Sequence, residues 1–194
     1  MTGVQTCALP ICGYSSSLKG TSDGFIVRFD SKLQRAVSYT FIGGSGDDRI
    51  RSVCKDEQNA IYVTGETTSN DFPTTSGVTG KLYKASIDGF AAKFDSTLKT
   101  LQVGFYHGGN KDDIPTAISI GQNGLIYISG YTNSTTNFPV TFPETITITI
   151  PGSKGKPPTY RTDPGGGKNL GQIDGFVASF SVNGAMQQIG RAHV

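Results

Sequence analysis

The sequence predicts an all-β fold built from a unit that repeats with a period of 65 positions. Residues 23–30 (DGFIVRFD) recur at 88–95 (DGFAAKFD), and the offset between the two copies is 88 − 23 = 65. A third copy begins at Asp174 (DGFVASF). Elsewhere the chain has short alternating apolar runs between turn residues, and no long stretch of helical period. A fixed repeat with this alternation indicates strands arranged in successive similar units.

The repeated segment has the pattern of a strand. In residues 90–94 (FAAKF) the first, third and fifth side chains point to one face, and the alanine and lysine between them point to the other. The copies at 25–29 and 176–180 alternate in the same way. We therefore expect a strand with one packed face in each copy. A second strand is expected at 98–106, with its counterpart at 33–41.

A loop and two further strands complete the unit. The loop is rich in glycine and aspartate, reading GGSGDD at 43–48 and GGNKDD at 108–113. The two strands that follow occur in both copies, at 50–54 and 61–65, and at 114–120 and 126–130. A polar turn joins them, and its Asn123-Gly124 pair tolerates the positive φ of a tight hairpin. Four strands per period joined by short turns is the pattern of one β-propeller blade.

Four motifs together resemble a known family. DGFAAKFDSTL, GGSGDD, NAIYVTGET and DFPTT are similar to the seven-bladed β-propeller repeat of bacterial surface and secreted proteins (SBBP-type repeats). The resemblance covers nearly all of residues 12–188. It implies a ring of blades and an exported protein. It implies no activity common to all members, and it supplies no catalytic residues to transfer.

In propeller order, with strands A to D in each blade, the chain holds about two and a half four-stranded antiparallel blades. Residues 13–45 supply strands C and D of one blade, and 46–109 supply a full blade. Residues 110–188 supply strands A to C of a third, with an inserted loop. The offset from Gly65 to Asp88 is 23, whereas that from Gly130 to Asp174 is 44, so the insertion spans 44 − 23 = 21 positions. Within it, residues 145–150 alternate like a strand, which favours a hairpin or an extended loop.

The two ends of the chain read as translated sequencing adapter. Residues 1–11 (MTGVQTCALPI) and 189–194 (IGRAHV) match the two strands of one common short-read adapter, and we interpret them as not native. Residues 12–188 would then be an open fragment of a longer gene. Cys54 is the one cysteine clear of adapter sequence, which favours a small buried side chain over a disulfide or a zinc site.

Charge and hydropathy exclude two classes of partner. Without Arg191, 16 lysines and arginines stand against 15 aspartates and glutamates. This near-neutral balance offers no electrostatic basis for nucleic-acid binding. No apolar run has the length of a membrane span, so membrane insertion is not expected.

The candidate site residues lie in loops expected at one rim. Paired carboxylates, Asp47 with Asp48 and Asp112 with Asp113, can supply oxygen ligands for Ca²⁺. The alternative is that each aspartate accepts hydrogen bonds from backbone N–H groups of its own turn. Antiparallel strand order brings the loops that carry Phe72 and Phe138 to the same rim, together with the insertion. Calcium is the only cofactor candidate.

No catalytic constellation is apparent. His107 is the one histidine outside the end segments, and no nucleophile accompanies it in the sequence. Ser45 lies in Gly-Ser-Gly rather than in the Gly-x-Ser-x-Gly of a nucleophile elbow. We therefore expect no catalytic residue in this chain.

The expected function is a non-enzymatic extracellular or cell-surface module that acts as a binding or structural scaffold. Its expected partners are a protein or glycan at a cell surface and, in the longer protein, further blades of the same chain. The alternative is a fragment of a propeller enzyme acting on glycans, with its active site in blades outside this chain. Propellers host both kinds of function, and fold alone does not decide between them.

Overall fold

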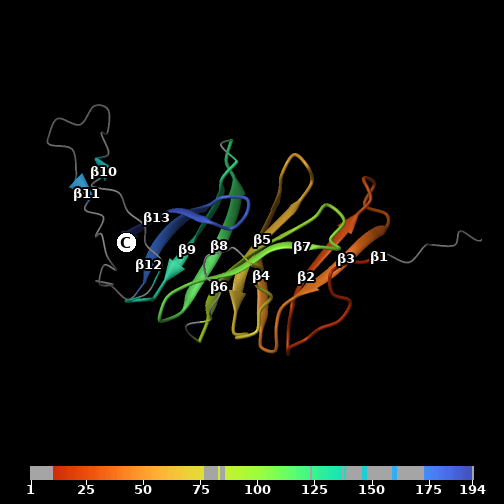
Figure 1. Cartoon of the computed structure of the whole chain (residues 1–194), viewed down its shortest axis with the longest axis horizontal. Helices are drawn as coiled ribbons and strands as arrows, with labels where there is room; N and C mark the ends of the chain where they lie inside the picture. Colours follow the sequence, from red (N-terminus) through yellow and green to blue (C-terminus); the bar gives the residue numbers. More distant parts are fainter. Residues whose placement is uncertain are drawn as a thin grey trace, which may run out of the picture.

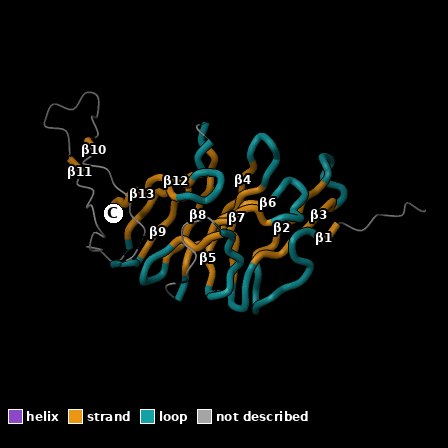
Figure 2. Tube along the Cα trace, viewed as in Figure 1, coloured by secondary structure: helices purple, strands orange, loops and turns teal. Residues whose placement is uncertain are grey.

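The structure is a computed structural model that describes residues 11–76, 83, 86–122, 124–136, 138, 146–147, 159–160 and 173–193. These residues form strands, turns and loops, and the all-β prediction is confirmed (Figure 2). No helix among them has the length and apolar character that crossing a bilayer requires.

Three sheets lie side by side along the chain (Figure 1). The first contains the antiparallel pair β2 (Gly24–Phe29) and β3 (Ala36–Ile42), with the short β1 (Ile11–Cys12) parallel to β3. The second contains β4 (Asp48–Lys55), β5 (Ile61–Thr67), β6 (Asp88–Phe94) and β7 (Leu101–His107). The third contains β8 (Asp113–Ile120), β9 (Ile126–Thr132), β12 (Asp174–Phe180) and β13 (Met186–His193).

The second and third sheets are antiparallel meanders with the same strand order and register. Asp48 pairs with Thr67 in one, and Asp113 pairs with Thr132 in the other, so both partners shift by one full period. Both first strands carry an irregularity at the same place, between Ile50 and Ser52 and between Pro115 and Ala117. The sequence repeat is therefore a repeat of backbone geometry, including its bulge.

The second strand of the second sheet and that of the third sheet each contain a glycine that lies very close to the backbone of the preceding strand. A Cβ at Gly65 would lie 1.9 Å from the carbonyl oxygen of Arg49, and one at Gly130 would lie 2.2 Å from that of Ile114. These distances are far below van der Waals contact, so no larger residue fits without backbone movement. This explains the glycine that ends the Ile-Tyr-Val-Thr-Gly motif and its copy.

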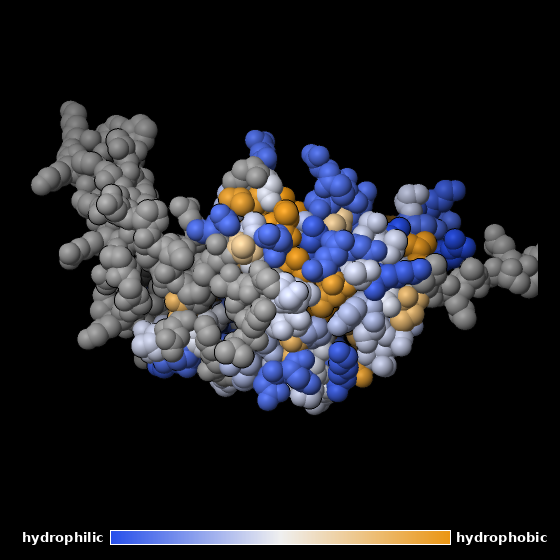
Figure 3. Space-filling model, viewed as in Figure 1, coloured by the Kyte–Doolittle hydropathy of each residue, from blue (hydrophilic) through white to orange (hydrophobic). Residues whose placement is uncertain are grey.

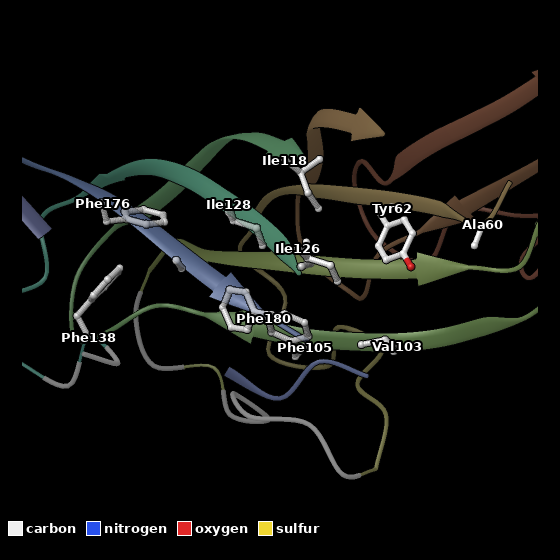
Figure 4. Packing of buried hydrophobic residues seen from close by; sticks show 12 residues of the cluster. Ala60, Tyr62, Val103, Phe105, Ile118, Ile126, Ile128, Phe138, Phe176 and Phe180 are labelled. Carbon is white, nitrogen blue, oxygen red and sulfur yellow. The ribbon is translucent and has the colours of Figure 1, made fainter. Parts of the chain in front are cut away.

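The middle sheet is buried on both faces. Phe90, Ala92 and Phe94 on β6 pack in a cluster with residues of the first sheet, such as Ile42. Ala91, on the opposite face, belongs to a second cluster that is completed by the third sheet (Figure 4). The expectation of one packed face per strand is therefore wrong for β6, because a sheet stacks on each side of it.

The outer faces of the first and third sheets are open. Phe25 and Phe29 of β2 are 52% and 47% exposed, whereas their counterparts Phe90 and Phe94 are 0% exposed. The same contrast holds at the other end, where Val177 of β12 is exposed and its counterpart in β6 is buried. Equivalent sequence positions thus differ in burial only because one sheet has a neighbour and the other does not.

Two leucines predicted to begin strands lie in turns instead. The apolar pattern predicts strands at 98–106 and 33–41, but β7 begins at Leu101 and β3 at Ala36. Leu98 has φ 65° and Leu33 has φ 56°, both in the left-handed region.

The aspartate that ends each of the first two DGF segments closes these turns. Asp95 accepts the N–H of Leu98 on its backbone oxygen (3.1 Å) and the N–H of Thr100 on its carboxylate (2.9 Å). Asp30 does the same for Leu33 (3.0 Å) and Gln34 (2.9 Å). Local side-chain hydrogen bonds thus hold the chain in a turn where apolar alternation alone predicts a strand.

The hairpin turn within each meander has positive φ at the second residue of the expected pair, but Gln58, the first residue of the earlier pair, does not have positive φ. Gly124 has φ 73°, and Asn59, which lies one period earlier, has φ 62°. Asparagine and glycine are the residues that adopt this region most readily. Asn123 lies outside the described residues.

The third sheet has a fourth strand that the sequence interpretation does not include. β13 pairs with β12 from Asp174 opposite His193 to Phe180 opposite Met186. Its last part, and Ile11 in β1, belong to the end segments that we interpret as adapter. Pairing along a sheet edge uses main-chain N–H and C=O groups, so an extended segment of unrelated sequence can occupy it.

Part of the insertion forms a minimal hairpin. β10 (Ile146–Thr147) pairs antiparallel with β11 (Thr159–Tyr160). The other residues of the insertion, including most of the alternating run at 145–150, lie outside the described residues.

Candidate functional site

The glycine-aspartate loop of each unit is hydrogen-bonded to the loop that follows the second strand of the same sheet. In the first copy, Gly46 N–H donates to Ser69 Oγ (2.8 Å) and Asp47 N–H to Thr68 Oγ1 (2.7 Å). In the second copy, Lys111 N–H donates to Ser134 Oγ (2.9 Å). These contacts place both kinds of loop at one end of each sheet. Figure 3 shows one face of the molecule, with hydrophilic residues at both its upper and its lower edge.

The second aspartate of each pair is buried and caps the loop. Asp48 Oδ2 accepts hydrogen bonds from Gly44 N–H (2.8 Å) and from Ser69 Oγ (2.7 Å). The arrangement is an aspartate turn reinforced by a serine hydroxyl. A buried carboxylate held by two donors is a structural element of the loop.

The same arrangement recurs in the next unit. Asp113 Oδ2 accepts from Gly109 N–H (2.6 Å) and from Ser134 Oγ (2.7 Å). We call these two arrangements the aspartate junctions: Asp48 with Gly44 and Ser69, and Asp113 with Gly109 and Ser134.

The first aspartate of each pair reaches the preceding sheet. Asp47 Oδ1 accepts from Ser22 Oγ (2.9 Å), and Asp112 Oδ1 accepts from Ser86 Oγ. Ser22 and Ser86 lie just before the DGF segments. The backbone N–H of Asp48 also donates to Ser22 O (2.8 Å). Each loop is thereby hydrogen-bonded to the segment that leads into the DGF strand of the preceding sheet.

A further aspartate, which sequence analysis did not single out, belongs to each junction. A Cβ at Gly43 would lie 2.6 Å from both Asp23 Oδ1 and Asp48 Oδ2. At Gly108 the corresponding distances are 2.6 Å to Asp88 Oδ1 and 2.8 Å to Asp113 Oδ2. Two carboxylates therefore flank the first glycine of each Gly-Gly pair. The available signal was the aspartate that begins every copy of the DGF repeat.

Burial and hydrogen bonding act differently on two of these carboxyl groups. Burial is the main reason that the pKa of Asp48 is raised, and the neighbouring Asp23 charge acts in the same direction. The pKa of Asp71 is lowered, chiefly by the N–H of Ser45, which donates to its carboxylate (2.7 Å). The exposed loop edge thus favours the charged form, and the buried junction disfavours it.

One carboxylate oxygen of each buried aspartate is engaged within its junction. Asp48 Oδ2 and Asp113 Oδ2 each accept two hydrogen bonds from the protein. Within the described part of the chain, no group of three or more carboxylate, histidine or cysteine side chains is placed to hold a metal ion. The geometry supports the structural role of these aspartates.

The two phenylalanines proposed for the rim are core residues in the structure. Phe72 stacks on Phe90 with ring centroids 4.4 Å apart, and its N–H donates to Tyr106 Oη (2.8 Å). Phe138 is buried beside His107 and Phe176, at centroid distances of 5.1 Å from each (Figure 4 labels Phe138 and Phe176). Their rings anchor the loops to the sheets, which accounts for their recurrence in both units.

His107 and Ser45 have structural surroundings. His107 is buried, and besides Phe138 and Phe176 its ring also contacts Phe180, at a centroid distance of 5.4 Å. Ser45 is exposed and its Oγ donates to Asp71 Oδ1 (3.0 Å). The two residues therefore do not form a nucleophile and base pair.

Comparison of the chain with protein-family models and with curated protein sequences produced no match.

Proposed function

We propose that each four-stranded sheet is one blade of a β-propeller and that the module is a non-enzymatic scaffold. We place it on the outside of a bacterial cell, where its loops bind a protein or a glycan. The observation that carries this proposal is the repeated stacking of similar sheets with an apolar face left open at each end.

The interfaces within the chain indicate what covers the open faces. Phe90 and Phe94 lie at the interface between the first and second sheets, and Phe176 and Phe180 lie at the next one. Phe25 and Phe29 occupy the same positions on the outermost sheet. A further sheet packed against them would bury these rings as the others are buried, which is how successive blades of one longer chain would assemble.

The hydrogen bonds and buried side chains of the loop end support the scaffold role. Buried aspartates, serines and phenylalanines hold the loops to the sheets, and loops on a rigid frame are where binding functions concentrate. The one histidine of the expected native segment lies in the core. The described loops thus favour a scaffold over the alternative of an enzyme acting on glycans.

The test is self-association of the full chain, because an unpaired blade face can pack against the open face of another copy. We expect concentration-dependent association in size-exclusion chromatography with light scattering, and binding of a hydrophobic dye. Replacing both Phe25 and Phe29 by lysine should weaken association by at least about tenfold. Burying two half-exposed rings is worth roughly 1 kcal/mol each, and the charges oppose burial.

Leu33→Lys is the matched control, since Leu33 is 78% exposed but lies in a turn rather than on the sheet face. It should leave association unchanged. A wild-type chain that stays monomeric at all concentrations and binds no dye would overturn the proposal that further blades pack against these faces. Equal effects of the control and the double variant would do the same.

A further inference from the structure

A small pocket lies where the first sheet meets the turn between β6 and β7. Its volume is about 190 Å³, and it is lined by residues of β2, β3 and that turn. The lining residues are Arg28, Val37, Ser38, Thr97 and Lys99. The pocket belongs to the first interface between sheets and is separate from the aspartate junctions.

Backbone pairing and one hydrogen bond define the position of Arg28. Arg28 and Ser38 are direct cross-strand partners on β2 and β3, so their side chains lie on the same face. The Arg28 guanidinium donates from Nη1 to the backbone oxygen of Ser96 in the facing turn. A guanidinium carries five N–H donors, so further N–H groups remain for a ligand.

The charge of the pocket is positive. Arg28 and Lys99 are both exposed, and the ion pairs among the described residues are those of Arg49 and Arg51 with Glu66. The acidic group of the turn is Asp95, whose carboxylate accepts from Thr97 Oγ1 and from the N–H of Thr100. The residues that line the pocket include two cationic side chains and no carboxylate, so the lining itself carries positive charge.

Ser38 adds a hydroxyl in need of a partner. It is 5% exposed, and its Oγ has no hydrogen-bond partner among the described residues. Burying a hydroxyl without a partner is unfavourable, and a bound oxygen atom would satisfy it. A serine side chain has one torsion between heavy atoms, so it can turn its hydroxyl toward such an atom.

The second interface shows that the pocket is not a requirement of the repeat. The counterpart of Ser38 there is Val103, which is buried in the core cluster. The counterpart of Arg28 is Lys93, whose Nζ lies over the Tyr62 ring, 5.2 Å from its centroid. The same two positions are thus filled by packing at one interface, whereas at the other they carry two polar side chains of the pocket lining.

We propose that this pocket binds a single oxyanion group, a sulfate or a phosphate. Arginine, lysine and a hydroxyl are donors that together satisfy the several oxygens of such a group, and hydrogen bonds between charged partners are the strong ones. The volume lies below the roughly 300–1,000 Å³ of pockets for drug-sized ligands, which favours one small group. The group is either a free inorganic anion or the sulfate or phosphate ester of a larger molecule.

The experiment is isothermal titration of the full chain with sodium sulfate and with sodium phosphate. Chloride holds the ionic strength constant, because screening alone changes such affinities. We expect one site per chain. Lys99→Met should weaken binding about tenfold or more, and it leaves the fold intact because Lys99 is exposed. Ser38→Val, which copies the valine of the second interface, should weaken it severalfold.

Lys93→Met is the matched control, because it removes the same charge at the other interface. It should leave the dissociation constant unchanged. Absence of sulfate and phosphate binding at tens of millimolar would overturn the proposal, as would equal weakening by Lys93→Met and Lys99→Met. Methyl sulfate and methyl phosphate distinguish the sources: binding as tight as that of the free anions assigns the pocket to an ester, and loss of binding assigns it to inorganic anions.

Discussion

Removing the serine of an aspartate junction tests whether the loop end is a rigid frame. Ser69 is buried, its Oγ donates to Asp48 Oδ2 (2.7 Å), and it accepts the N–H of Gly46 (2.8 Å). Ser69→Ala leaves the carboxylate with one donor fewer and leaves the N–H without its partner. A hydrogen bond to a charged buried group is worth about 1.5–3 kcal/mol. Gly46 is only partly buried, so water replaces some of the second loss. We expect Ser69→Ala to cost about 2–3 kcal/mol at pH 7.

The assay is urea unfolding of the wild-type chain and the variant. With a denaturant dependence of roughly 2 kcal/mol/M, the expected loss lowers the midpoint by about 1–1.5 M. Ser45→Ala is the matched control, because Ser45 also donates to an aspartate of these loops, Asp71, but is exposed. Surface changes of this kind stay within about 0.5 kcal/mol.

The pH dependence of the loss provides a second readout. The Ser69 hydrogen bond lowers the pKa of Asp48 because it favours the charged carboxylate. Its removal should therefore cost more at pH 7 than at pH 4, where more of Asp48 is protonated. A loss at pH 7 no larger than that of Ser45→Ala, or one that grows as the pH falls, would refute the assignment of Ser69 to a charged junction.

Two other predictions concern the same sheets. The pKa of Asp48 in the folded protein is raised, so its favourable contribution is present at acid pH and is lost as the pH rises through that pKa. The free energy of unfolding of the wild type relative to Asp48→Asn should therefore fall as the pH rises above about 4, the ordinary pKa of an aspartate, in urea titrations. A rise would contradict the raised pKa. Leu98 and Leu33 share a positive φ, but Leu98 is 0% and Leu33 78% exposed. Leu98→Gly should cost about 2–4 kcal/mol through the lost packing, whereas Leu33→Gly should stay within about 1 kcal/mol, because relief of backbone strain offsets the added unfolded-state entropy. Thermal and urea melts measure both, and similar losses would show that burial does not decide the outcome.

Local patterns in the sequence were sufficient for most strands and their order. The alternation in residues 90–94 predicts a strand, and the fixed period predicts that the next unit repeats it, as the shared registers of the second and third sheets show. The predicted strand starts at Leu33 and Leu98 are too early, because both leucines continue the apolar alternation of the strands that follow them. Hydrogen bonds to the preceding aspartate hold each leucine in a turn instead, and the apolar periodicity of the sequence contains no information about them.

For the candidate aspartates too, the local role could be predicted from sequence and the contacts between strands could not. Their capping of a loop was one of two interpretations open from sequence, since an aspartate can bond the backbone of its own turn. That Asp48 is buried against Ser69, and that Asp23 reaches the same glycine, depends on how separate strands lie beside one another.

The all-β class, the repeat and the composition of each strand can be read from the amino-acid sequence, because these depend on neighbours within a few residues and on a fixed spacing. Which faces are buried depends on the packing of one sheet against another. Phe25 and Phe90 occupy the same place in the repeat, yet one is half-exposed and the other is enclosed. The pocket of Arg28 and Lys99 likewise joins residues 99 − 28 = 71 positions apart. Burial and pocket formation depend on which sheet lies against which, and no local pattern of residues carries that information.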